Sequence, residues 1–544
     1  MGNKKQNVAP VSNDSGKKGV DKKINGTRLF LLIFAAVALV AIITAIIFAV
    51  VQNANNKLVD FENDDLSKYV SLSRDDYKSF DVTVNVDPVT DNAVENKIIQ
   101  LLYKNRKDSE DMRFKQGETI RVGDTANIYY YGYTLDSDGN KVPFTGGCNF
   151  GSEKSTALGI GSGSFVEGFE LGLIGKNQND YATVTKSSAT KATAEDTVFI
   201  TYTAIYSDGT YEKDATALID LTDEGIEEEW GEGFGLYLCS ATVGTKVSKE
   251  FKRTYTDENG KTKSDIIYDV TVNAIVELGE GEPLTVEAYF PVGYTNTALA
   301  GKTAYFDVYI MTTQLYDTPE FNDEFVTGTL KYTAEELAEY EGETLADKYR
   351  SMIRAGLERD YGYAVDNAIE SALWDVLMDK AEFKRLPENE VMAYYNGYVA
   401  EVESYYNYYA GTSQSTDLDT VACSYLQLDK GTDWRAYLRE SAEESISQKL
   451  VFYYLLQLEN IHPTDEEKQE MYDVLVDYYL EQYLVNYKVE RSNYKTLEEY
   501  QHAVDGYRST VLGNYGEDYF RENALFLAAL EHLKQYANLI YVNN

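Results

Sequence analysis

Hydrophobic and polar residues alternate along one part of the chain and recur at helical spacing along another. Between residues 117 and 315, Gly, Thr, Val and Tyr alternate in short runs separated by turn dipeptides, which are Asp138-Gly139, Asp208-Gly209 and Asn259-Gly260. A period of two with such turns predicts antiparallel strands joined by hairpins. From about residue 333 the apolar spacing becomes helical and stays so nearly to the end. We therefore predict a β-rich domain followed by a helical domain.

Shorter patterns locate individual elements. Residues 80–86 alternate with the period of a strand, and after Pro88 apolar residues at Val94, Ile98 and Leu101 predict a helix. Acidic first turns at Thr333-Ala-Glu-Glu-Leu337 and Thr464-Asp-Glu-Glu467 indicate helix starts. The polar residues 411–420 predict a loop between helices.

One segment is apolar without any period. Residues 29–51 are 23 residues without a charge, long enough as a helix for roughly 35 Å, whereas a bilayer core is about 30 Å thick. Residues 1–28 carry seven basic and two acidic side chains, so the positive-inside rule predicts a cytoplasmic amino terminus. The competing interpretation is a cleavable signal peptide, whose apolar region is about 7–15 residues. We predict a single-pass cell-membrane protein that contacts the lipid bilayer through residues 29–51 and has the bulk of its chain extracytoplasmic.

The charge balance excludes several classes of protein. The net charge is −39, and since residues 1–28 carry +5, the remainder carries −44. Nucleic-acid binding is not expected, because it requires clustered Lys and Arg. Three histidines and three widely spaced cysteines give no metal-ligand spacing, so we expect neither a metal nor a cofactor. The cysteines are expected to be small buried apolar residues, and a disulfide bond between two of them is the alternative.

A run of motifs in the β-rich part carries a family resemblance. It consists of Val122-Gly-Asp-Thr-Ala-Asn-Ile-Tyr-Tyr-Tyr-Gly132, Phe144-Thr-Gly-Gly147, Leu158-Gly-Ile-Gly-Ser-Gly-Ser-Phe-Val-Glu-Gly-Phe-Glu170 and Tyr289-Phe-Pro-Val-Gly-Tyr294. These residues resemble an FKBP-type peptidyl-prolyl isomerase domain, and the Phe-x-Gly-Gly form is similar to that of trigger factor. Farther on, Leu386-Pro387-Glu388 and the apolar residues 450–461 resemble the trigger-factor carboxy-terminal chaperone domain.

The resemblance implies an α+β multidomain protein, in which an FKBP-like antiparallel sheet domain with an insertion precedes an all-α chaperone domain. The expected parts are a basic tail (1–28), a transmembrane helix (29–51), a stalk (52–110), an isomerase domain (111–330) with an inserted subdomain (187–283), and a helical domain (331–544). The ribosome-docking signature Gly-Phe-Arg-x-Gly-Lys is absent, so ribosome binding is not expected. The insertion is interpreted either as an insert-in-flap domain or as a degenerate second copy, because residues 199–209 repeat the strand-turn pattern of residues 128–139.

The chemistry of an isomerase suits a domain without histidine. Rotation about an X-Pro bond meets a barrier of about 18–20 kcal/mol and needs no acid, nucleophile or metal. A dry aromatic pocket favours the twisted amide. By resemblance the catalytic pocket is lined by Tyr130, Phe144, Phe165, Val166, Phe169, Tyr294 and Phe306, with Leu158 and Thr145 binding substrate. Thr145 stands where the family is usually acidic, and Phe169 where it often has Trp.

These observations predict a membrane-anchored extracytoplasmic foldase, both peptidyl-prolyl isomerase and chaperone, whose partners are unfolded or proline-containing translocated polypeptides. The alternatives are a holdase without isomerase activity and a non-catalytic surface binding protein. Tyrosine outnumbers phenylalanine by 47 to 21, and its clusters in the helical part fit either client binding or packing between helices. Those clusters are Tyr394-Tyr395, Tyr405 to Tyr409, Tyr453-Tyr454 and Tyr478-Tyr479.

Overall fold

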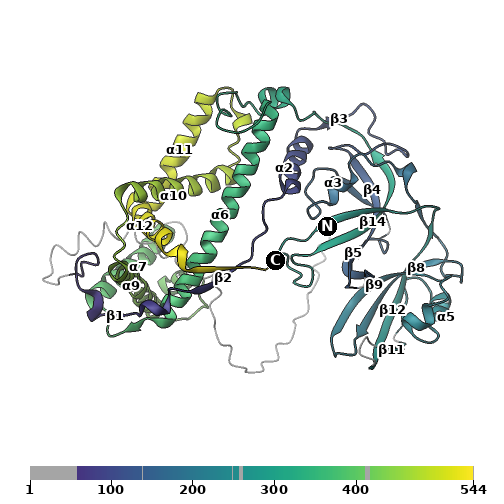
Figure 1. Cartoon of the computed structure of the whole chain (residues 1–544), viewed down its shortest axis with the longest axis horizontal. Coiled ribbons are helices and arrows are strands. Elements are labelled where there is room, and N and C mark those ends of the chain that lie inside the picture. Colours follow the sequence, from purple (N-terminus) through teal and green to yellow (C-terminus); the bar gives the residue numbers. More distant parts are fainter. Residues whose placement is uncertain are drawn as a thin grey trace, which may run out of the picture. The chain divides into compact units, whose positions relative to one another are not determined.

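The structure is a computed structural model that describes residues 58–542 apart from 138, 153, 248, 257–260 and 411–416. The described chain divides into two compact units, each built from several stretches of sequence (Figure 1). Of the described residues, 81–368, 489–503 and 538–542 form the β-rich unit, and 58–80, 369–488 and 504–537 form the helical unit. The predicted basic tail and transmembrane helix, 1–28 and 29–51, lie outside the described residues. Of the helices that the structure does describe, none is long and apolar enough to cross a membrane.

The β-rich unit contains a five-stranded antiparallel sheet, which we call the outer sheet. Its strands are β4 (Thr125–Leu135), β5 (Lys141–Cys148), β6 (Thr156–Gly159), β13 (Leu284–Tyr289) and β14 (Thr303–Gln314). The strand order is β13-β14-β4-β5, and β6 pairs with β4 beside β5. The short helix α3 (Phe169–Leu173) packs against β13, and its apolar side chains close one core of the sheet.

The predicted insertion forms a second antiparallel sheet, which we call the inner sheet. It holds β7 (Val184–Lys186), β8 (Thr197–Ile205), β9 (Tyr211–Asp220), β10 (Lys246–Val247), β11 (Phe251–Thr256) and β12 (Thr262–Leu278), with α4 (Ile226–Trp230) and α5 (Phe234–Ser240). Its order β11-β12-β8-β9 repeats β13-β14-β4-β5, and in both sheets a hairpin, a short helix and a second hairpin follow one another along the chain. Because the insertion begins after α3 and ends before β13, the structure agrees with a second copy of one topology nested inside the first.

A shared aromatic layer joins the two sheets. Along β4 the side chains alternate, so that Ala126 and Ile128 face the outer core while Tyr129, Tyr131 and Tyr133 face the inner sheet. These tyrosines pack with residues of both copies, which include Phe150, Val184, Phe199, Ala274, Val276 and Tyr309. Strands β5 and β9 also touch at this boundary, where Figure 1 shows the two sheets lying together. The run of three tyrosines in β4 thus serves two cores at once.

A third core of the β-rich unit is helical. It joins α2 (Asp91–Lys104), the π-helical turn η4 (Phe325–Thr329) and the first turns of α6 (Leu345–Lys380). The segment at Thr333 does not begin a helix as predicted: residues 334–339 form turns, and α6 begins at Leu345. Glu336 accepts hydrogen bonds from Thr333 as a helix start would, but its other oxygen accepts from the Arg491 guanidinium, 2.9 Å away.

The remaining elements of the β-rich unit are short. Strand β2 (Phe80–Val84) follows the predicted alternation and pairs with β17 (Ala537–Tyr541), although each of these strands begins in the helical unit. Strands β3 (Lys107–Asp108) and β15 (Tyr316–Asp317) form a two-stranded pair, and η3 (Gln178–Asp180) follows α3. The short helix η5 (Arg491–Asn493) lies in residues 489–503, where the chain returns to the β-rich unit, and we call these residues the returning segment.

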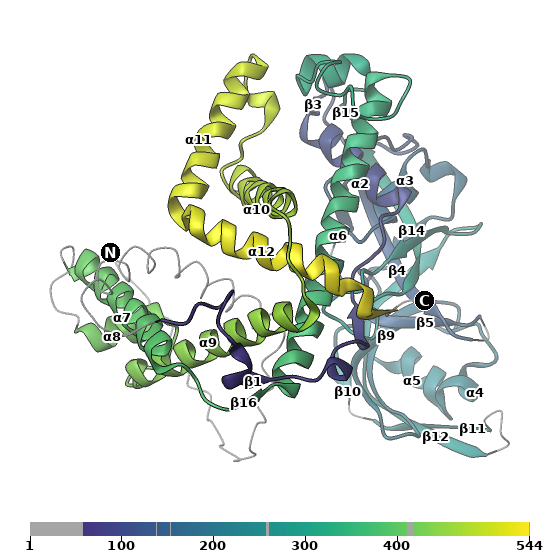
Figure 2. The same cartoon turned by 60° about the vertical axis from the view of Figure 1, so that its left-hand side comes forward.

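The helical unit is built from packed helices, with α7, α8 and α9 in one group and α10 beside α12 (Figure 2). Its helices are α7 (Glu388–Ala410), α8 (Leu418–Tyr425), α9 (Trp434–Glu459), α10 (Asp465–Asn486), most of α11 (Leu497–Tyr515) and α12 (Glu517–Leu533), ending in η6 (Lys534–Tyr536). The helix start predicted at Thr464 is present, since α10 begins at Asp465 and Thr464 forms a capping box with Glu467. Residues 418–420, predicted as loop, begin α8 because Asp417 caps that helix. The stalk adds η1 (Leu66–Lys68), β1 (Val70–Ser71) and η2 (Arg74–Asp76), and β1 pairs with β16 (Glu382–Phe383).

Candidate functional site

Eight of the nine predicted site residues lie in one apolar cluster of the outer sheet. Tyr130 and Phe306 come from neighbouring strands, and Phe169 comes from α3 beneath them. Phe169 stacks on Phe165 with ring centroids 4.3 Å apart and meets Phe306 edge-on at 5.0 Å. The Tyr130 ring stands perpendicular to Phe165 at 5.4 Å. The other members are Phe144, Leu158, Val166 and Tyr294.

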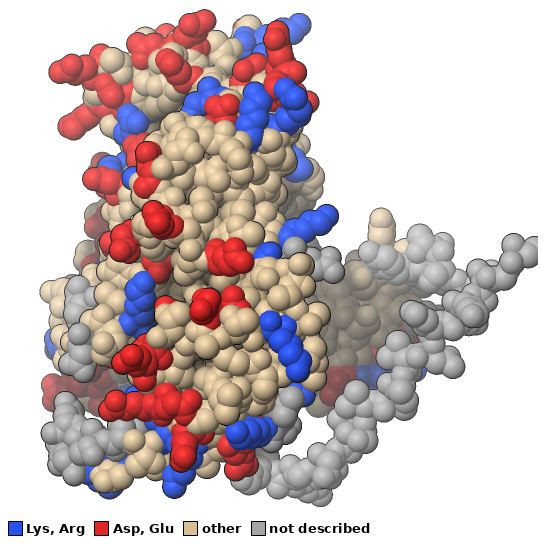
Figure 3. Space-filling model, turned by 90° about the vertical axis from the view of Figure 1, so that its right-hand side faces the viewer, with Lys and Arg blue, Asp and Glu red and all other residues tan. Residues whose placement is uncertain are grey.

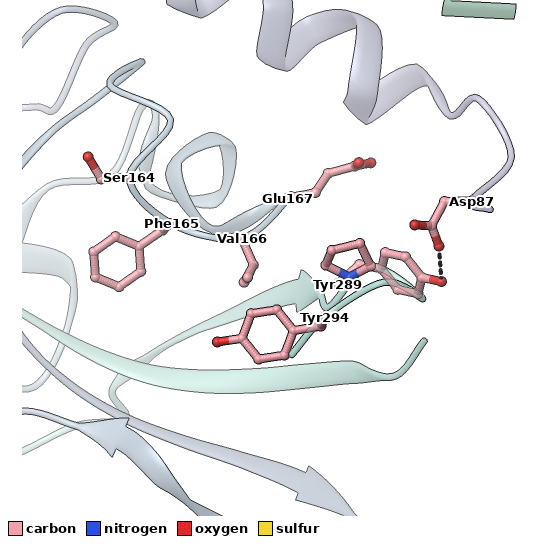
Figure 4. A pocket seen from close by; sticks show the side chains of 8 residues that line it. Asp87, Ser164, Phe165, Val166, Glu167, Tyr289 and Tyr294 are labelled. Atoms are coloured by element: carbon pink, nitrogen blue, oxygen red, sulfur yellow. Dashed lines mark hydrogen bonds between the residues drawn. The ribbon is translucent and has the colours of Figure 1, made fainter. Parts of the chain in front are cut away.

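The cluster has a buried floor and a half-buried wall. Phe169 and Phe306 are 0% and 4% exposed, whereas Phe165 and Val166 remain partly accessible. A pocket of about 450 Å³ opens beside this wall, lined by Asp87, Ser164, Phe165, Val166, Glu167, Tyr289, Pro291 and Tyr294. Figure 4 shows the Val166 side chain pointing toward the Tyr294 ring, whereas the Ser164 hydroxyl points away. Phe165 is therefore shared by the pocket wall and the aromatic core.

A buried carboxylate fixes the loop that carries Phe165. Glu170 on α3 is 3% exposed and accepts hydrogen bonds from the backbone N–H groups of Gly161 (2.6 Å), Gly163 (3.3 Å), Ser164 (2.9 Å) and Phe165 (3.4 Å). The Ser162 hydroxyl donates a fifth bond. Gly161 has a φ of 100°, and a Cβ there would lie 2.4 Å from the Ile99 carbonyl oxygen. The glycines of this loop thus serve backbone turns around a carboxylate rather than a phosphate.

The segment before α2 forms one rim of the pocket, which the motifs did not predict. Asp87 accepts hydrogen bonds from the Tyr289 hydroxyl at 2.6 Å and from the backbone N–H of Val292 (Figure 4). Three residues later, the Thr90 hydroxyl donates to Glu167 at 2.5 Å. No sequence signal links Asp87 to residues two hundred positions away. Two carboxylates, Asp87 and Glu167, therefore stand at the pocket together with its aromatic side chains.

Thr145 is the predicted residue that does not join the cluster. It is exposed on β5, and its hydroxyl lies 3.5 Å from the Asp214 carbonyl oxygen of the inner sheet. The preceding Phe144 turns inward and meets Phe290 and Phe306 edge-on. Alternate residues of a strand face opposite sides, so Thr145 points away from the pocket.

We expect Thr145→Ala to leave peptide binding and any isomerase rate within twofold of the unchanged protein, because its side chain does not line the pocket. A proline-peptide isomerisation assay on the full chain measures this, with Phe144→Leu as the comparison within the same strand. A tenfold loss in Thr145→Ala would restore the substrate-binding role predicted from the sequence.

The tyrosines of the helical unit divide between packing and exposure. Tyr479 is buried and its hydroxyl lies 2.6 Å from that of Tyr519. Tyr394 contacts Lys449, and burial raises the pKa of its phenol. Tyr408 is 73% exposed. Part of the tyrosine excess therefore packs helices, while Tyr408 faces solvent.

Neither thiol pairing nor a metal-ligand cluster is found in the described chain. Cys148, Cys239 and Cys423 are free thiols, and burial raises the pKa of Cys148 to about 12. Among the described residues, no group of three or more His, Cys, Asp or Glu could hold a metal ion.

Comparison with known proteins matches the helical part to a family. Residues 345–499 match the family described as the bacterial trigger factor protein C-terminus. The trigger factor of Caldicellulosiruptor bescii is 25% identical over 283 residues, covering 50% of this chain and 57% of that protein. That of Halothermothrix orenii is 29% identical over 248 residues, covering 45% and 52%. The chain therefore spans about half the length of the curated relatives it matches.

A solved structure that concerns promiscuous substrate recognition in the folding and assembly activities of the trigger factor chaperone aligns with this chain at 12% sequence identity. The alignment covers 65% of this chain and 64% of the chain in that structure. The TM-score of 0.19 is too low for that alignment to carry an argument. The family match and the curated relatives support a trigger-factor-like protein with a mixed α and β multidomain fold and a helical carboxy-terminal region.

The location predicted from the sequence is wrong. A single-pass cell-membrane protein with an extracytoplasmic body was expected, but the curated relatives that this chain matches are trigger factors, and none of the described helices could cross a membrane. The uncharged residues 29–51, on which that prediction and the predicted contact with lipid depended, lie outside the described residues.

Proposed function

We propose that this protein is a trigger-factor-like chaperone whose outer sheet is an FKBP-type peptidyl-prolyl isomerase acting on unfolded, proline-containing polypeptides. The observation that supports this most strongly is the aromatic cluster around Phe165, which lies against an open pocket on the outer sheet. The similarity of residues 345–499 to the trigger factor C-terminus supports the chaperone half.

The proposed mechanism uses burial and orientation instead of proton transfer. A proline ring enters beside Phe165, Val166 and Tyr294, which remove its imide from water. The twisted amide has less charge separation than the planar one, so it loses less hydration free energy on leaving water. The barrier to rotation about the X-Pro bond therefore falls. The backbone at Val166 would hold the substrate by a hydrogen bond. Among the described residues lining the pocket there is no histidine, cysteine or lysine, and the reaction requires none.

The test is catalysis of cis/trans exchange in a proline tetrapeptide by the full chain. We expect Phe165→Ala to lower kcat/KM at least tenfold, because the pocket loses its aromatic wall while Phe169 still fills the core below. Phe165→Leu should retain more activity, and equal thermal unfolding of the variants would show that the fold persists.

No acceleration by the unchanged protein would reject the isomerase half of the proposal. Suppression of client aggregation that is unchanged in Phe165→Ala would then support the holdase alternative. Binding of a single folded partner, with no affinity for unfolded chains, would reject the chaperone half as well.

A further inference from the structure

The inner sheet repeats the aromatic geometry of the outer sheet as well as its strand order. Tyr202 meets Trp230 edge-on at 5.2 Å and 86°, and Tyr130 meets Phe165 at 5.4 Å and 86°. Trp230 stacks on Phe234 at 5.1 Å, the counterpart of the stacked Phe165 and Phe169. A third ring stands perpendicular to each stack, Phe251 at 4.9 Å in the inner sheet and Phe306 at 5.0 Å in the outer one, although Phe251 comes from β11, the counterpart of β13, and Phe306 comes from β14.

The sequence explains why the two clusters correspond. Tyr130 and Tyr202 each stand six residues after an Asp-Thr pair, which begins at Asp124 and Asp196 respectively. The stacked rings stand four residues apart in Phe165-Val-Glu-Gly-Phe169 and in Trp230-Gly-Glu-Gly-Phe234. In both, a glycine with positive φ precedes the short helix: Gly168 at 91° and Gly233 at 78°. Only glycine adopts this conformation without strain.

Burial is graded in the same way in both clusters. Phe234 and Phe251 are closed off in the inner core, as Phe169 and Phe306 are in the outer one. Tyr202 and Trp230 remain partly accessible, as Tyr130 and Phe165 do. Nearby on α5, Leu236 is 77% exposed. Figure 3 views the side of the molecule on which β8, β12 and α5 are labelled in Figure 1, and broad areas of this face carry no charged side chain despite the acidity of the chain.

We propose that Tyr202 and Trp230 form a second binding site for proline-containing segments of unfolded polypeptides. The inference rests on the proposed function of the outer sheet, because the ligand is assigned from the matching ring geometry. Aromatic surfaces are also the general means by which proteins hold proline-rich segments, whose extended backbone loses little entropy on binding.

The second site binds proline without isomerising it. The residue corresponding to Val166 is Gly231, and its N–H already donates to the Glu227 carbonyl at 3.0 Å. The residue corresponding to Glu170, which orders the outer loop, is Gly235. Phe144 stands five residues after the glycine of the β4–β5 turn, and the same position after Gly209 is Asp214. The inner copy therefore lacks an available donor at the Val166 position and one aromatic wall, and its loop is held by a different carboxylate, Glu227, which accepts hydrogen bonds from the backbone N–H groups of Gly233 and Gly235.

The experiment is a calorimetric titration of the full chain with a proline tetrapeptide, which reports the number of sites. We expect two equivalents for the unchanged protein and for Leu236→Ala, which removes a neighbouring exposed apolar side chain. Trp230→Ala should bind one equivalent with kcat/KM unchanged. Phe165→Ala should also lose one equivalent, but with loss of the isomerase rate. Trp230→Leu keeps part of the apolar volume without the aromatic ring and should also bind one equivalent, which excludes poor folding of Trp230→Ala as the cause of the loss.

The outcomes separate this inference from the proposed function. A single equivalent in the unchanged protein, with no change in Trp230→Ala and Trp230→Leu, would overturn the second site. So would equal binding of a peptide with alanine in place of proline, because the site would then be a general apolar surface. If Phe165→Ala changes neither activity nor stoichiometry while the Trp230 variants still lose an equivalent, the outer site fails and the inner one stands.

A client with two prolines would engage both sites of one molecule. Linked binding events raise overall affinity, so Trp230→Ala should weaken such a client about tenfold or more while leaving the tetrapeptide rate unchanged. Equal affinity of the variant and the unchanged protein for this client would contradict simultaneous use of the two sites.

Discussion

Glu170→Ala is expected to lower the free energy of unfolding by about 3 kcal/mol or more, because it leaves buried backbone N–H donors without an acceptor, at about 1–3 kcal/mol each. Four N–H groups of the loop from Gly161 to Phe165 converge on this one carboxylate. Without it the loop loses its shape and Phe165 loses its place against Phe169, so the isomerase rate should fall together with stability. Urea unfolding and the tetrapeptide assay measure the two effects.

Two further variants make this prediction specific. Glu287→Ala removes an exposed carboxylate from neighbouring β13 and should stay within about 0.5 kcal/mol of the unchanged protein. Glu170→Gln keeps one acceptor oxygen but turns an amide donor toward the loop, so its stability should fall between the other two. Equal stability of Glu170→Ala and Glu287→Ala would show that the loop does not depend on the carboxylate.

Arg491→Ala is expected to destabilise the β-rich unit by about 3–5 kcal/mol, the usual cost of leaving a buried charge without its partner. The side chains of Arg491 and Glu336 are only 4% and 12% exposed, and their 2.9 Å contact holds the returning segment 489–503 to the turns after residue 333. Hydrogen exchange should show residues 489–503 opening first. Glu336→Gln removes the charge of the partner side chain, and a double-mutant cycle of the two substitutions gives the interaction free energy between Arg491 and Glu336.

The same ion pair predicts a dependence on pH. Burial raises the pKa of Glu336, but hydrogen bonds from Arg491 and Thr333 outweigh it and hold the pKa below the ordinary 4.5. A carboxyl with a lowered folded-state pKa stabilises the fold above its ordinary pKa, and this is lost as pH falls through the lowered value. Protection of segment 489–503 should therefore decline below about pH 4.5 in the unchanged protein, whereas Arg491→Ala should show a smaller decline.

Local patterns predicted those parts of the fold that local contacts determine. The capping box at Thr464 starts α10 because its partners are three residues apart, and Phe165 and Phe169, which the resemblance assigned to one pocket, stand close in sequence and stack on each other. Thr333 carries the same local signal and forms the same hydrogen bonds with Glu336, yet only turns follow before α6 begins, and Glu336 also binds Arg491, 155 residues farther on. A local sequence pattern does not predict a contact with a residue so far along the chain.

The candidate site also combines residues that the sequence predicted with residues that only distant contacts bring to the pocket. Strand alternation and family spacing brought eight aromatic and apolar residues to one cluster, but Asp87 reached the pocket through contacts some two hundred residues apart. The resemblance assigned Thr145 a role by its position, without the direction of its side chain, and the substrate-binding role of Thr145 stays a prediction. The duplication did have a sequence signal in the repeated Glu-Gly-Phe at Glu167 and Glu232, and the strand orders gave that signal its meaning.

The nesting of one sheet within the other sets an order for folding during synthesis. A ribosome releases the chain from its amino terminus, so the inner sheet has all its strands once Leu278 has emerged. The outer sheet must still wait for β13 and β14, which supply its central partner strand and the Phe306 ring. In the meantime β4 exposes its tyrosines, and the completed inner sheet covers them on one side. We therefore expect the inserted copy to cover this apolar surface while the outer sheet is still incomplete.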